Sequence, residues 1–468
     1  MKGNCVNTTF YIAMNNSGVY IIGVSDTDEK VCAASGRIST QSGTALEIME
    51  KSQDRVKNAN LITKVTASGH TSTIEHIFFN LAFENVSVVV EQFMIEFRLA
   101  SFTVKSRRYV DFSQSGYYMP ELKDDIKKKF TSHIDSLFAL YSEMTEAGIP
   151  KEDARFVLPY CFFSNFYCSL GGRELVHVLK AMLYGRGKKI KEIYNLGLSL
   201  LDQCKNYAPG IFSDFEKRYS KYNDDADLSF INAETSDNIK KNVEILSYTK
   251  DASFTVAKTA LIEKLGISSE KCDELLSDNE TLSKVISSVL KSDRPRALES
   301  IQFTVRYNNV TLSTLTHFAR HRMQSLMVPS LANVDRNAYI IAPSISKNES
   351  LLSKYIDAFE RTADLYKEMK ENGYSESETV YCLLSGNTLS ITSTMNAREL
   401  KLFLKLRTCR RAQWEIQDLS VELLKGLRDI SPEIFSNFGP SCYCDGFCPE
   451  GRLTCGSAKE MREFFSTL

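Results

Sequence analysis

Apolar residues alternate with polar ones from Thr8 to Ser25, a period of two that predicts strands. Residues Ile77 to Val90 are mostly β-branched or aromatic and predict one long strand. Leu122 to Gly148 has the spacing of an amphipathic helix and ends in a Gly-Ile-Pro stop signal. In the second half, Ile301 to Leu312 predicts a strand and Leu351 to Gly373 predicts a helix with its own glycine stop. The two halves therefore predict the same order of elements.

Helical spacing recurs between these elements, and one short strand opens the second half. The further predicted segments are helices at Ala45–Lys64, from Lys151 toward Pro159, at Arg173–Lys189, Ile190–Leu201, Asp251–Leu290 and Asn396–Leu427, and a strand at Ile245–Tyr248. Strands placed next to helices predict an α+β fold, in which each half forms a mainly antiparallel sheet with flanking helices.

The second half repeats the first in its residues as well as in its elements. Glu75 to Ser101 aligns with Glu299 to Ser325 at a constant offset of 224, without a gap. Arg173-Glu174-Leu175 then aligns with Arg398-Glu399-Leu400 at an offset of 225. A period of this length indicates a duplicated domain rather than a solenoid of small units.

The junction between the two copies is expected where the hydrophobic pattern weakens, from about Asn206 to Asn242. This stretch contains Pro209-Gly210 and an acidic cluster. We therefore predict two domains, residues 1–235 and 236–468, each long enough to bury a full core.

The overall composition is ordinary for a soluble globular protein, with 43% apolar and 25% charged residues among 468. A net charge of −1 gives no global field for nucleic acid or an anionic membrane, and neither partner is expected. Because no apolar stretch follows a basic start, we expect no secretory signal, and no apolar run approaches the ~18 residues of a membrane span. Twelve scattered cysteines fit reducing surroundings, so we expect a cytoplasmic protein.

The densest candidate for chemistry is Arg320-His321-Arg322, which follows a strand-like segment and is separated from Ser330 by seven residues. Guanidinium forks bind phosphate or enolate-like carbonyl oxygens in a bidentate way, which lysine cannot do. The histidine adds a donor or a stacking group. Taken alone, the tripeptide is also compatible with a solvated basic turn.

Two further segments accompany this tripeptide. Asn396-Ala397-Arg398 is followed on a predicted helix by Arg407 and by Ala412-Gln413-Trp414-Glu415-Ile416, and Gly69-His70-Thr71-Ser72 with Glu75-His76 precedes the first long strand. In combination the segments resemble the flavin-dependent thymidylate synthases. That family's signature is Arg-His-Arg, seven residues and Ser, flanked by His-x-Ser/Thr-x-x-Glu-His and an Asn-Ala-Arg-x-Leu helix. The resemblance covers nearly the whole chain as two tandem copies.

The resemblance implies a reductive methylation of dUMP to dTMP, with FAD as cofactor, NADPH as reductant and methylenetetrahydrofolate as carbon donor. No cysteine attacks the uracil, so the protein contributes binding, orientation and electrostatics. Family members are homotetramers whose active sites draw residues from several subunits. A chain with two copies is therefore expected to form a homodimer that imitates the tetramer.

The first copy keeps one part of the family's site. The positions that match its dUMP-phosphate segments are Ser106, Arg108 and Arg155, and those that match its flavin and folate edge are His70, Ser72 and Glu75. Its Arg-His-Arg motif is broken, because Glu96-Phe97-Arg98 stands there. Met182 stands where the second copy has Arg407.

The second copy keeps the other part. The positions that match cofactor-binding residues are Arg320, His321, Arg322, Asn396 and Arg398, and Arg320 and Ser330 also match the nucleotide side. Arg407 is the catalytic candidate, expected on the uracil carbonyls, where it stabilises charge that develops as the ring is activated. Ala332 and Val380 replace the arginines that the first copy has at the equivalent positions.

Each copy thus lacks roughly what the other keeps, which predicts a complete site built from residues of both and a second, inactive one. Two alternatives remain. One is a catalytically inactive nucleotide- or flavin-binding paralogue of the same fold. The other is an altered pyrimidine or folate substrate, since Met327 and Val328 replace residues that are usually polar in the motif.

Four cysteines, Cys442, Cys444, Cys448 and Cys455, cluster in the C-terminal tail with Gly and Pro turns. Such thiols can hold zinc or an iron–sulfur cluster. Their spacing is not that of a standard zinc ribbon, so we predict no metal site and free or redox-sensitive thiols instead.

Overall fold

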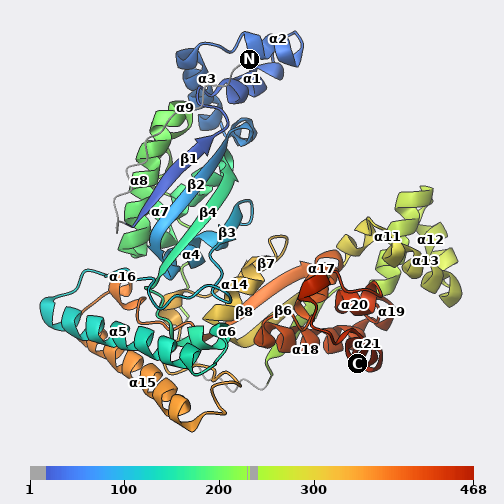
Figure 1. The fold of residues 1–468 in the computed structure, drawn as a ribbon. Coiled ribbons are helices and arrows are strands. Elements are labelled where there is room, and N and C mark those ends of the chain that lie inside the picture. The colour runs from blue at the N-terminus through green and yellow to red at the C-terminus, as the bar shows by residue number, and fades with distance from the viewer. Residues whose placement is uncertain (1–16, 229, 232–240) are drawn as a thin grey trace. The chain divides into compact units, whose positions relative to one another are not determined.

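The computed structural model describes residues 17–228, 230–231 and 241–468, which fold into two compact units (Figure 1). Unit 1 holds the described residues up to Ser142, with Pro159–Ile231 and Leu365–Cys382. Unit 2 holds Glu143–Leu158, the described residues from 241 to Asp364, and Leu383–Leu468. Each unit therefore takes one short segment from the other half of the sequence. The predicted boundary at 235/236 lies outside the described residues, as does the Thr8–Asn16 part of the first predicted strand.

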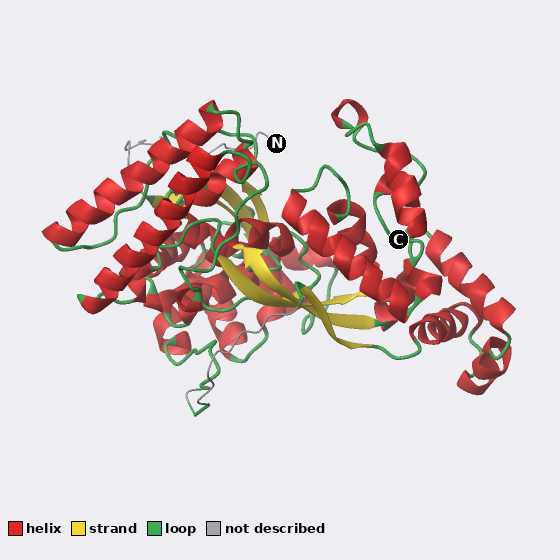
Figure 2. Cartoon of the chain, turned by 90° about the horizontal axis from the view of Figure 1, so that it is seen from below, coloured by secondary structure: helices red, strands yellow, loops and turns green. Residues whose placement is uncertain are grey.

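Unit 1 is built on a four-stranded antiparallel sheet of order β1-β2-β4-β3. Its strands are β1 (Gly18–Val24), β2 (Phe78–Ser87), β3 (Ser101–Val104) and β4 (Phe163–Gly171). Phe79, Leu81 and Phe83 of β2 alternate inward and are fully buried. Helices α7 (Gly172–Leu183) and α8 (Lys191–Tyr207) pack beside this sheet, and Figure 2 shows helices flanking the strands.

Unit 2 repeats this topology with the sheet order β5-β6-β8-β7. Its strands are β5 (Val243–Tyr248), β6 (Gln302–Thr311), β7 (Ser325–Met327) and β8 (Thr388–Asn396), and its corresponding helices are α17 (Ala397–Arg407) and α18 (Trp414–Ile430). All three strand pairings are antiparallel. The predicted α+β class, with two mainly antiparallel sheets and flanking helices, is confirmed.

An irregularity in the long strand is repeated as well. The register of β2 against β4 shifts between Phe83 and Val86, and Asn85 there has a φ of 50°. The equivalent Asn309 of β6 has a φ of 54° at the same kind of shift. Asparagine tolerates the left-handed region better than most residues, so the repeated Asn marks a repeated bulge.

The end of the first long strand was predicted wrongly. Residues Val88–Val90 begin helix α4 (Val88–Ile95) instead of extending the strand. Ser87 Oγ accepts a hydrogen bond from N of Val90, which is the geometry of a helix N-cap. The buried carboxylate of Glu192 accepts from both N and Oγ of Ser87, at 2.8 and 2.6 Å. Because these polar groups cap a helix at Ser87, the apolar residues that follow form α4 instead of continuing the strand.

The same device operates in unit 2. Thr311 caps α14 (Leu312–Ala319), and its N and Oγ1 donate to the buried Glu415 at 2.7 and 2.6 Å. Strands β4 and β8, each of which pairs with a neighbour along both edges, were not predicted from the sequence.

The remaining described elements complete the two units. In unit 1 they are α1 (Lys30–Ile38), α2 (Ala45–Glu50), α3 (Arg55–Ala67), η1 (Thr71–His76), η3 (Arg186–Lys189), α9 (Pro209–Phe212), α10 (Phe215–Tyr219) and α16 (Glu376–Thr379). In unit 2 they are α6 (Lys151–Ala154), η2 (Arg155–Val157), α11 (Ala252–Leu265), α12 (Ser269–Leu276), α13 (Asn279–Lys291), η4 (Arg296–Ser300), η5 (Leu331–Asn333), α19 (Pro432–Phe435), α20 (Ser441–Cys444), η6 (Gly451–Leu453) and α21 (Ala458–Thr467).

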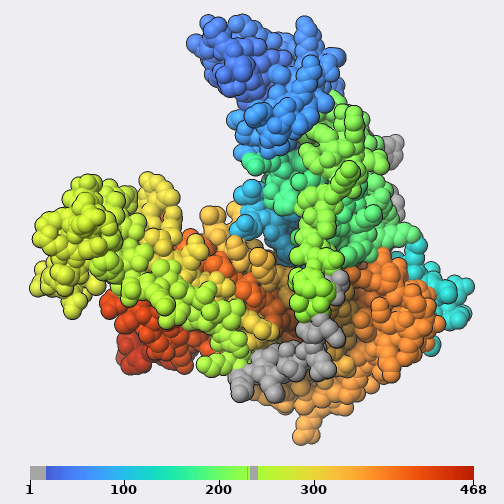
Figure 3. All heavy atoms as spheres, turned by 180° about the vertical axis from the view of Figure 1, so that it is seen from behind, coloured from blue at the N-terminus to red at the C-terminus, as the bar shows by residue number. Residues whose placement is uncertain are grey.

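Two long helices contribute residues to both units: α5 (Asp124–Glu146) and α15 (Glu349–Glu371). Both predicted glycine stops are confirmed, because Gly148 and Gly373 have φ values of 85° and 81° just after these helices. The helices α11 to α13 contact one another and form a lobe of unit 2, yellow-green in Figure 3.

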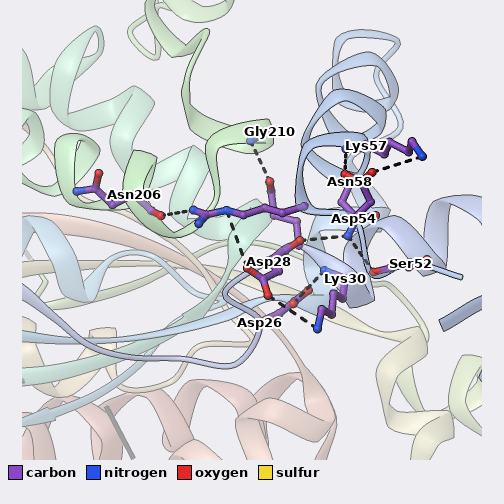
Figure 4. A network of polar contacts seen from close by, with 11 residues as sticks. Asp26, Asp28, Lys30, Ser52, Asp54, Lys57, Asn58, Asn206 and Gly210 are labelled. Atoms are coloured by element: carbon purple, nitrogen blue, oxygen red, sulfur yellow. Dashed lines mark hydrogen bonds and ion pairs between the residues drawn. The ribbon is translucent and has the colours of Figure 1, made fainter. Parts of the chain in front are cut away.

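A polar network ties the N-terminal helices of unit 1 to α8 and α9 (Figure 4). The buried carboxylate of Glu29 accepts hydrogen bonds from N of Gly210 at 3.0 Å and N of Ile211 at 3.1 Å. Arg55 reaches from α3 to the carbonyl of Asn206 at 2.9 Å. Burial raises the pKa of Glu29 to about 7, against the lowering effect of the two backbone donors.

Candidate active site

The turn after α14 brings a buried histidine against an arginine of α17. Arg320 is the C-cap residue of α14. The next residue, His321, is buried in unit 2 and only 5% exposed. Nε of Arg407 donates a hydrogen bond to Nε2 of His321 over 3.0 Å, and Nη2 donates to the carbonyl of His317 over 3.1 Å. Two of the predicted site residues, His321 and Arg407, therefore form one contact.

The protonation of His321 follows from its neighbours. Arg407 can only donate, so Nε2 must be the unprotonated acceptor and Nδ1 carries the proton. Nδ1 lies 3.4 Å from Oε1 of Glu399. Burial lowers the pKa of His321, the hydrogen bond with Glu399 opposes this, and the charge of Arg407 lowers it further. A neutral imidazole thus links Glu399 to Arg407 and holds the guanidinium in one orientation.

The start of α17 places these groups. Oδ1 of Asn396 accepts a hydrogen bond from N of Glu399 over 2.9 Å, as an N-cap side chain does. Glu399 therefore lies in the first turn, where the helix dipole favours a carboxylate, and it is 8% exposed. Arg398 instead lies at the surface and pairs with Glu299. Of the predicted motif, Asn396 supports the His321 contact and Arg398 does not.

A cationic surface lies beside the buried imidazole. Arg320 and Arg322 are both exposed on the turn that leads into β7. Ser330 is also exposed, and its Oγ caps η5 by accepting from N of Ala332 at 3.3 Å. Guanidinium groups on a surface turn can bind phosphate oxygens in a charge-assisted way. The geometry therefore gives this turn the means to bind an anionic group.

The equivalent turn of unit 1 is neutralised by its own side chains. Glu96 and Phe97 stand at the positions of Arg320 and His321. Oε2 of Glu96 accepts from Nη2 of Arg186 at 3.1 Å, and the Arg186 guanidinium lies 5.5 Å from the centre of the Phe97 ring. Burial raises the pKa of Glu96, and Arg186 opposes this. An anionic ligand would meet a carboxylate here, so this turn is a poor anion site.

The phosphate segment predicted in the first copy is a tight turn after β3. N of Val110 donates to the carbonyl of Ser106 at 3.0 Å, and N of Arg108 donates to Oγ of Ser106 at 3.4 Å. Ser106 and Arg108 are half-buried, while Arg107 between them is only 6% exposed. The structure therefore places Ser106 and Arg108 together on one turn of unit 1.

The flavin and folate edge predicted in the first copy lies at η1. His70, Ser72 and Glu75 are all exposed there. Glu75 forms an ion pair with Arg173 at 2.6 Å, and both side chains are about half exposed, so the pair contributes little stability. It corresponds by position to the Glu299 pair of unit 2.

Arg155 comes from the first half of the sequence but belongs to unit 2. It is 3% exposed, and its Nε donates to the carbonyl of Glu152 at 3.1 Å. Burial raises the pKa of Glu415 on α18, and the charge of Arg155 is among the groups that lower it. Asp153 of the same segment accepts from Nε1 of Trp414 at 2.9 Å. One predicted phosphate residue of the first copy is thus folded against elements of the second.

Two of the four cysteines of the C-terminal tail, Cys442 and Cys444, lie in helix α20. Among the residues that the structure describes, no three His, Cys, Asp or Glu side chains are placed to hold a metal ion. Sγ of Cys444 donates to the carbonyls of Asn437 and Gly439, at 3.2 and 3.1 Å. Burial raises the pKa of Cys442.

None of the described helices combines the length and the apolar content needed to cross a membrane.

Comparison with known proteins decides the family. The family model described as thymidylate synthase complementing protein matches residues 21–210 and, a second time, residues 244–433. The chain belongs to this family. The double match confirms both the predicted resemblance and its tandem form.

Relatives of this family member each align with about half of it. The flavin-dependent thymidylate synthase of Geobacter sulfurreducens is 30% identical over 227 residues, which cover 48% of this chain and 97% of the relative. The synthases of Clostridium tetani and Pyrococcus furiosus are 30% and 32% identical, covering 48% and 45% of this chain and 96% and 90% of each relative. A solved UMP/dUMP methylase, PolB from Streptomyces cacaoi with 5-Br dUMP, is 20% identical, covers 44% of this chain and 97% of its own, and has a TM-score of 0.38.

Two residues of this chain were missed by the sequence analysis. Glu399 orients His321, and Arg186 neutralises Glu96. The repeat carried a signal for Glu399, because Arg-Glu-Leu occurs in both copies. Nothing in the sequence pattern pointed to Arg186.

Proposed function

We propose that the protein is a flavin-dependent thymidylate synthase, which methylates dUMP to dTMP with FAD, NADPH and methylenetetrahydrofolate. Family membership and the names of the relatives support this reaction. The observation that carries the proposal is the His321–Arg407 contact, because it holds a guanidinium in place beside an exposed cationic turn. A protein that had only kept the fold would not need this arrangement.

We further propose that one complete site uses residues of both copies. Its first-copy residues would be Ser106, Arg108, Arg155 and His70, and its second-copy residues would be Arg320, His321, Arg322, Asn396 and Arg407. The placement of Arg155 within unit 2 supports such sharing. The neutralised turn at Glu96 supports the loss of the reciprocal site.

The donor set of the cationic turn fits a flavin dinucleotide. Arg320 and Arg322 are exposed, and the pyrophosphate of FAD is the kind of oxyanion that guanidinium groups bind. Arg398, His70, Ser72 and Glu75 would complete the cofactor contacts. Bound FAD, once reduced, would supply the electrons for forming the methyl group.

The remaining residues act on dUMP. Ser106 and Arg108 would hold its phosphate with charge-assisted hydrogen bonds, and Ser330 would assist on the nucleotide side. Arg407 would lie on the uracil carbonyls. Because His321 and the His317 carbonyl already fix this guanidinium, it needs no reorganisation when charge develops on the ring.

The test is dTMP formation by two variants, each with a matched control from the other copy. Arg407→Ala and Arg108→Ala should each lower kcat/KM by about 100-fold or more. Met182→Leu and Ala332→Ser change the equivalent positions of the other copy and should leave it unchanged. Full activity in either arginine variant would contradict the shared site.

The second candidate is an inactive paralogue that binds flavin or nucleotide, which the lost motif at Glu96-Phe97 favours. Colour and turnover separate the two. The enzyme should be yellow and should oxidise NADPH faster when dUMP is added. A colourless protein that still binds dUMP would support the paralogue. An NADPH oxidation stimulated by another pyrimidine instead would indicate an altered substrate.

We propose a homodimer, which would bring together four copies of the domain as in the family tetramer. We also propose a cytoplasmic location, which fits the free thiols of all described cysteines. Sedimentation at low and high protein concentration would test the dimer.

A further inference from the structure

Unit 1 contains a buried polar network under the turn that carries Ser106 and Arg108. Nη2 of Arg107 donates to Oε1 of Glu91 in α4, and Oγ of Ser164 in β4 donates to Oε2 of the same carboxylate. All three residues are buried, with exposed fractions of 2–6%. The Arg107 guanidinium also lies 5.4 Å from the centre of the Phe162 ring. The network fastens the turn to a helix and to the central strand.

Unit 2 shows that the fold does not require this network. At the offsets that align the two copies, Glu91, Arg107 and Ser164 correspond to Leu315, Leu331 and Leu389. All three polar residues are thus replaced by leucine in a unit with the same sheet order. Leu315 is fully buried and Leu389 is 8% exposed.

The network is costly where it occurs. A buried ion pair loses much of its attraction to desolvation, and apolar residues of similar volume are often equally stable. Nη1 of Arg107 is buried and has no hydrogen-bond partner among the described residues, which adds to the cost. A costly network kept in one copy and absent from the other indicates a role other than stability.

The role follows from the neighbours of Arg107. Ser106 and Arg108 flank it on a tight turn, are half-buried, and are the predicted phosphate ligands. The Glu91 carboxylate pairs with Arg107, so the Arg107 guanidinium is engaged inside unit 1 rather than presented to a ligand. We propose that Arg107 is a positioning residue that, held by Glu91 and Ser164, presents Ser106 and Arg108 to the phosphate of the pyrimidine nucleotide. This inference rests on the proposed function.

The test compares binding of dUMP with binding of deoxyuridine, which lacks the phosphate. Both affinities are measured by titration calorimetry on the full chain. The triple variant Glu91→Leu/Arg107→Leu/Ser164→Leu carries the residues of unit 2 and is expected to fold. It should bind deoxyuridine as the wild type does and bind dUMP about tenfold more weakly, since the phosphate ligands are no longer held in place.

Two variants serve as references. Arg107→Lys keeps the charge next to Glu91 but loses the planar fork, so it should keep part of the preference for dUMP. Lys129→Met removes an exposed ion pair of unit 1 with Glu368 and should change neither affinity. In turnover, the Arg107→Lys variant should raise KM for dUMP while kcat stays close to wild type.

The outcomes are separable. If the triple variant prefers dUMP over deoxyuridine as strongly as the wild type does, the positioning role is overturned and the proposed function stays intact. If the triple variant does not fold, the same result with Arg107→Lys leads to the same conclusion. A wild type that does not prefer dUMP overturns the proposed function, and the positioning role with it.

Discussion

Arg407 donates through Nε to Nε2 of His321 across 3.0 Å, and this hydrogen bond requires a neutral imidazole. The carboxylate of Glu399 meets the other ring nitrogen. The predicted catalytic guanidinium is therefore held by a histidine that the Arg-His-Arg signature contains, which gives the middle residue of the motif a role in orienting Arg407.

Replacing His321 with phenylalanine tests this role. Phe97 occupies the equivalent position of unit 1, so the ring is compatible with the fold. His321→Phe removes the acceptor for Arg407, and kcat should fall by about 100-fold because the guanidinium is no longer oriented before the reaction. Single-turnover dTMP formation measures this. Phe97→Leu is the control and should keep the wild-type kcat; an active His321→Phe enzyme would refute the orienting role.

The pH profile should report the titration of His321. Protonation puts a proton on Nε2, which breaks the hydrogen bond from Arg407, so activity should fall as pH drops through the pKa of His321. Burial lowers that pKa and Glu399 raises it. Glu399→Gln should therefore move the acid limb of kcat against pH to lower pH. A limb that stays in place would show that another group titrates.

The turn at Glu96 should matter for stability and not for turnover. Glu96→Arg places a second guanidinium group next to that of Arg186. The variant should lower the free energy of unfolding by about 1 kcal/mol, since the Glu96–Arg186 pair is partly exposed. Glu96→Gln keeps an acceptor and should stay within about 0.5 kcal/mol of wild type. Urea titration measures both. A fall in kcat in either variant would place this turn in a working site.

Stability should depend on pH through Glu29. Its pKa is raised by burial from 4.5 to about 7, so the folded state binds the proton more tightly than the unfolded chain. Stability is then greatest below the unfolded pKa and falls as pH rises from about 4.5 to about 7, by about 1–3 kcal/mol. Glu29→Gln should flatten the dependence of Tm on pH in this window. An unchanged slope would assign the pH dependence to other carboxylates.

Much of the fold follows from the sequence because the repeat doubles each signal. Strands β2 and β6 apart from their ends, the long helices α5 and α15, and both glycine stops were predicted from period and stop residues. The central strands β4 and β8 were not, because β8 is rich in hydroxyl residues that bond inside the unit. Thr394 bonds with Thr304 at 2.9 Å, and Ser393 donates to Gln324 at 2.7 Å. Polar residues satisfied in this way hide the apolar alternation of a buried strand.

The site was predicted only where local motifs carry it. The Asn-x-x-Glu start of α17 encodes its own cap, so the place of Asn396 follows from nearby residues, whereas the contact of Glu399 with His321 does not. The place of Arg155 in unit 2 depends on helix α5, whose last residues belong to that unit. An amphipathic pattern predicts that helix but not the unit against which its end packs. The neutralised turn at Glu96 also depends on Arg186, a partner ninety residues away.

The most direct test of the shared site is the number of dUMP molecules bound per polypeptide, measured by titration calorimetry with FAD present. Complementary copies leave one complete site for each chain, so the account predicts a stoichiometry of one. Two dUMP molecules per chain would show that each copy carries a working nucleotide site of its own, and would contradict the division of residues between them.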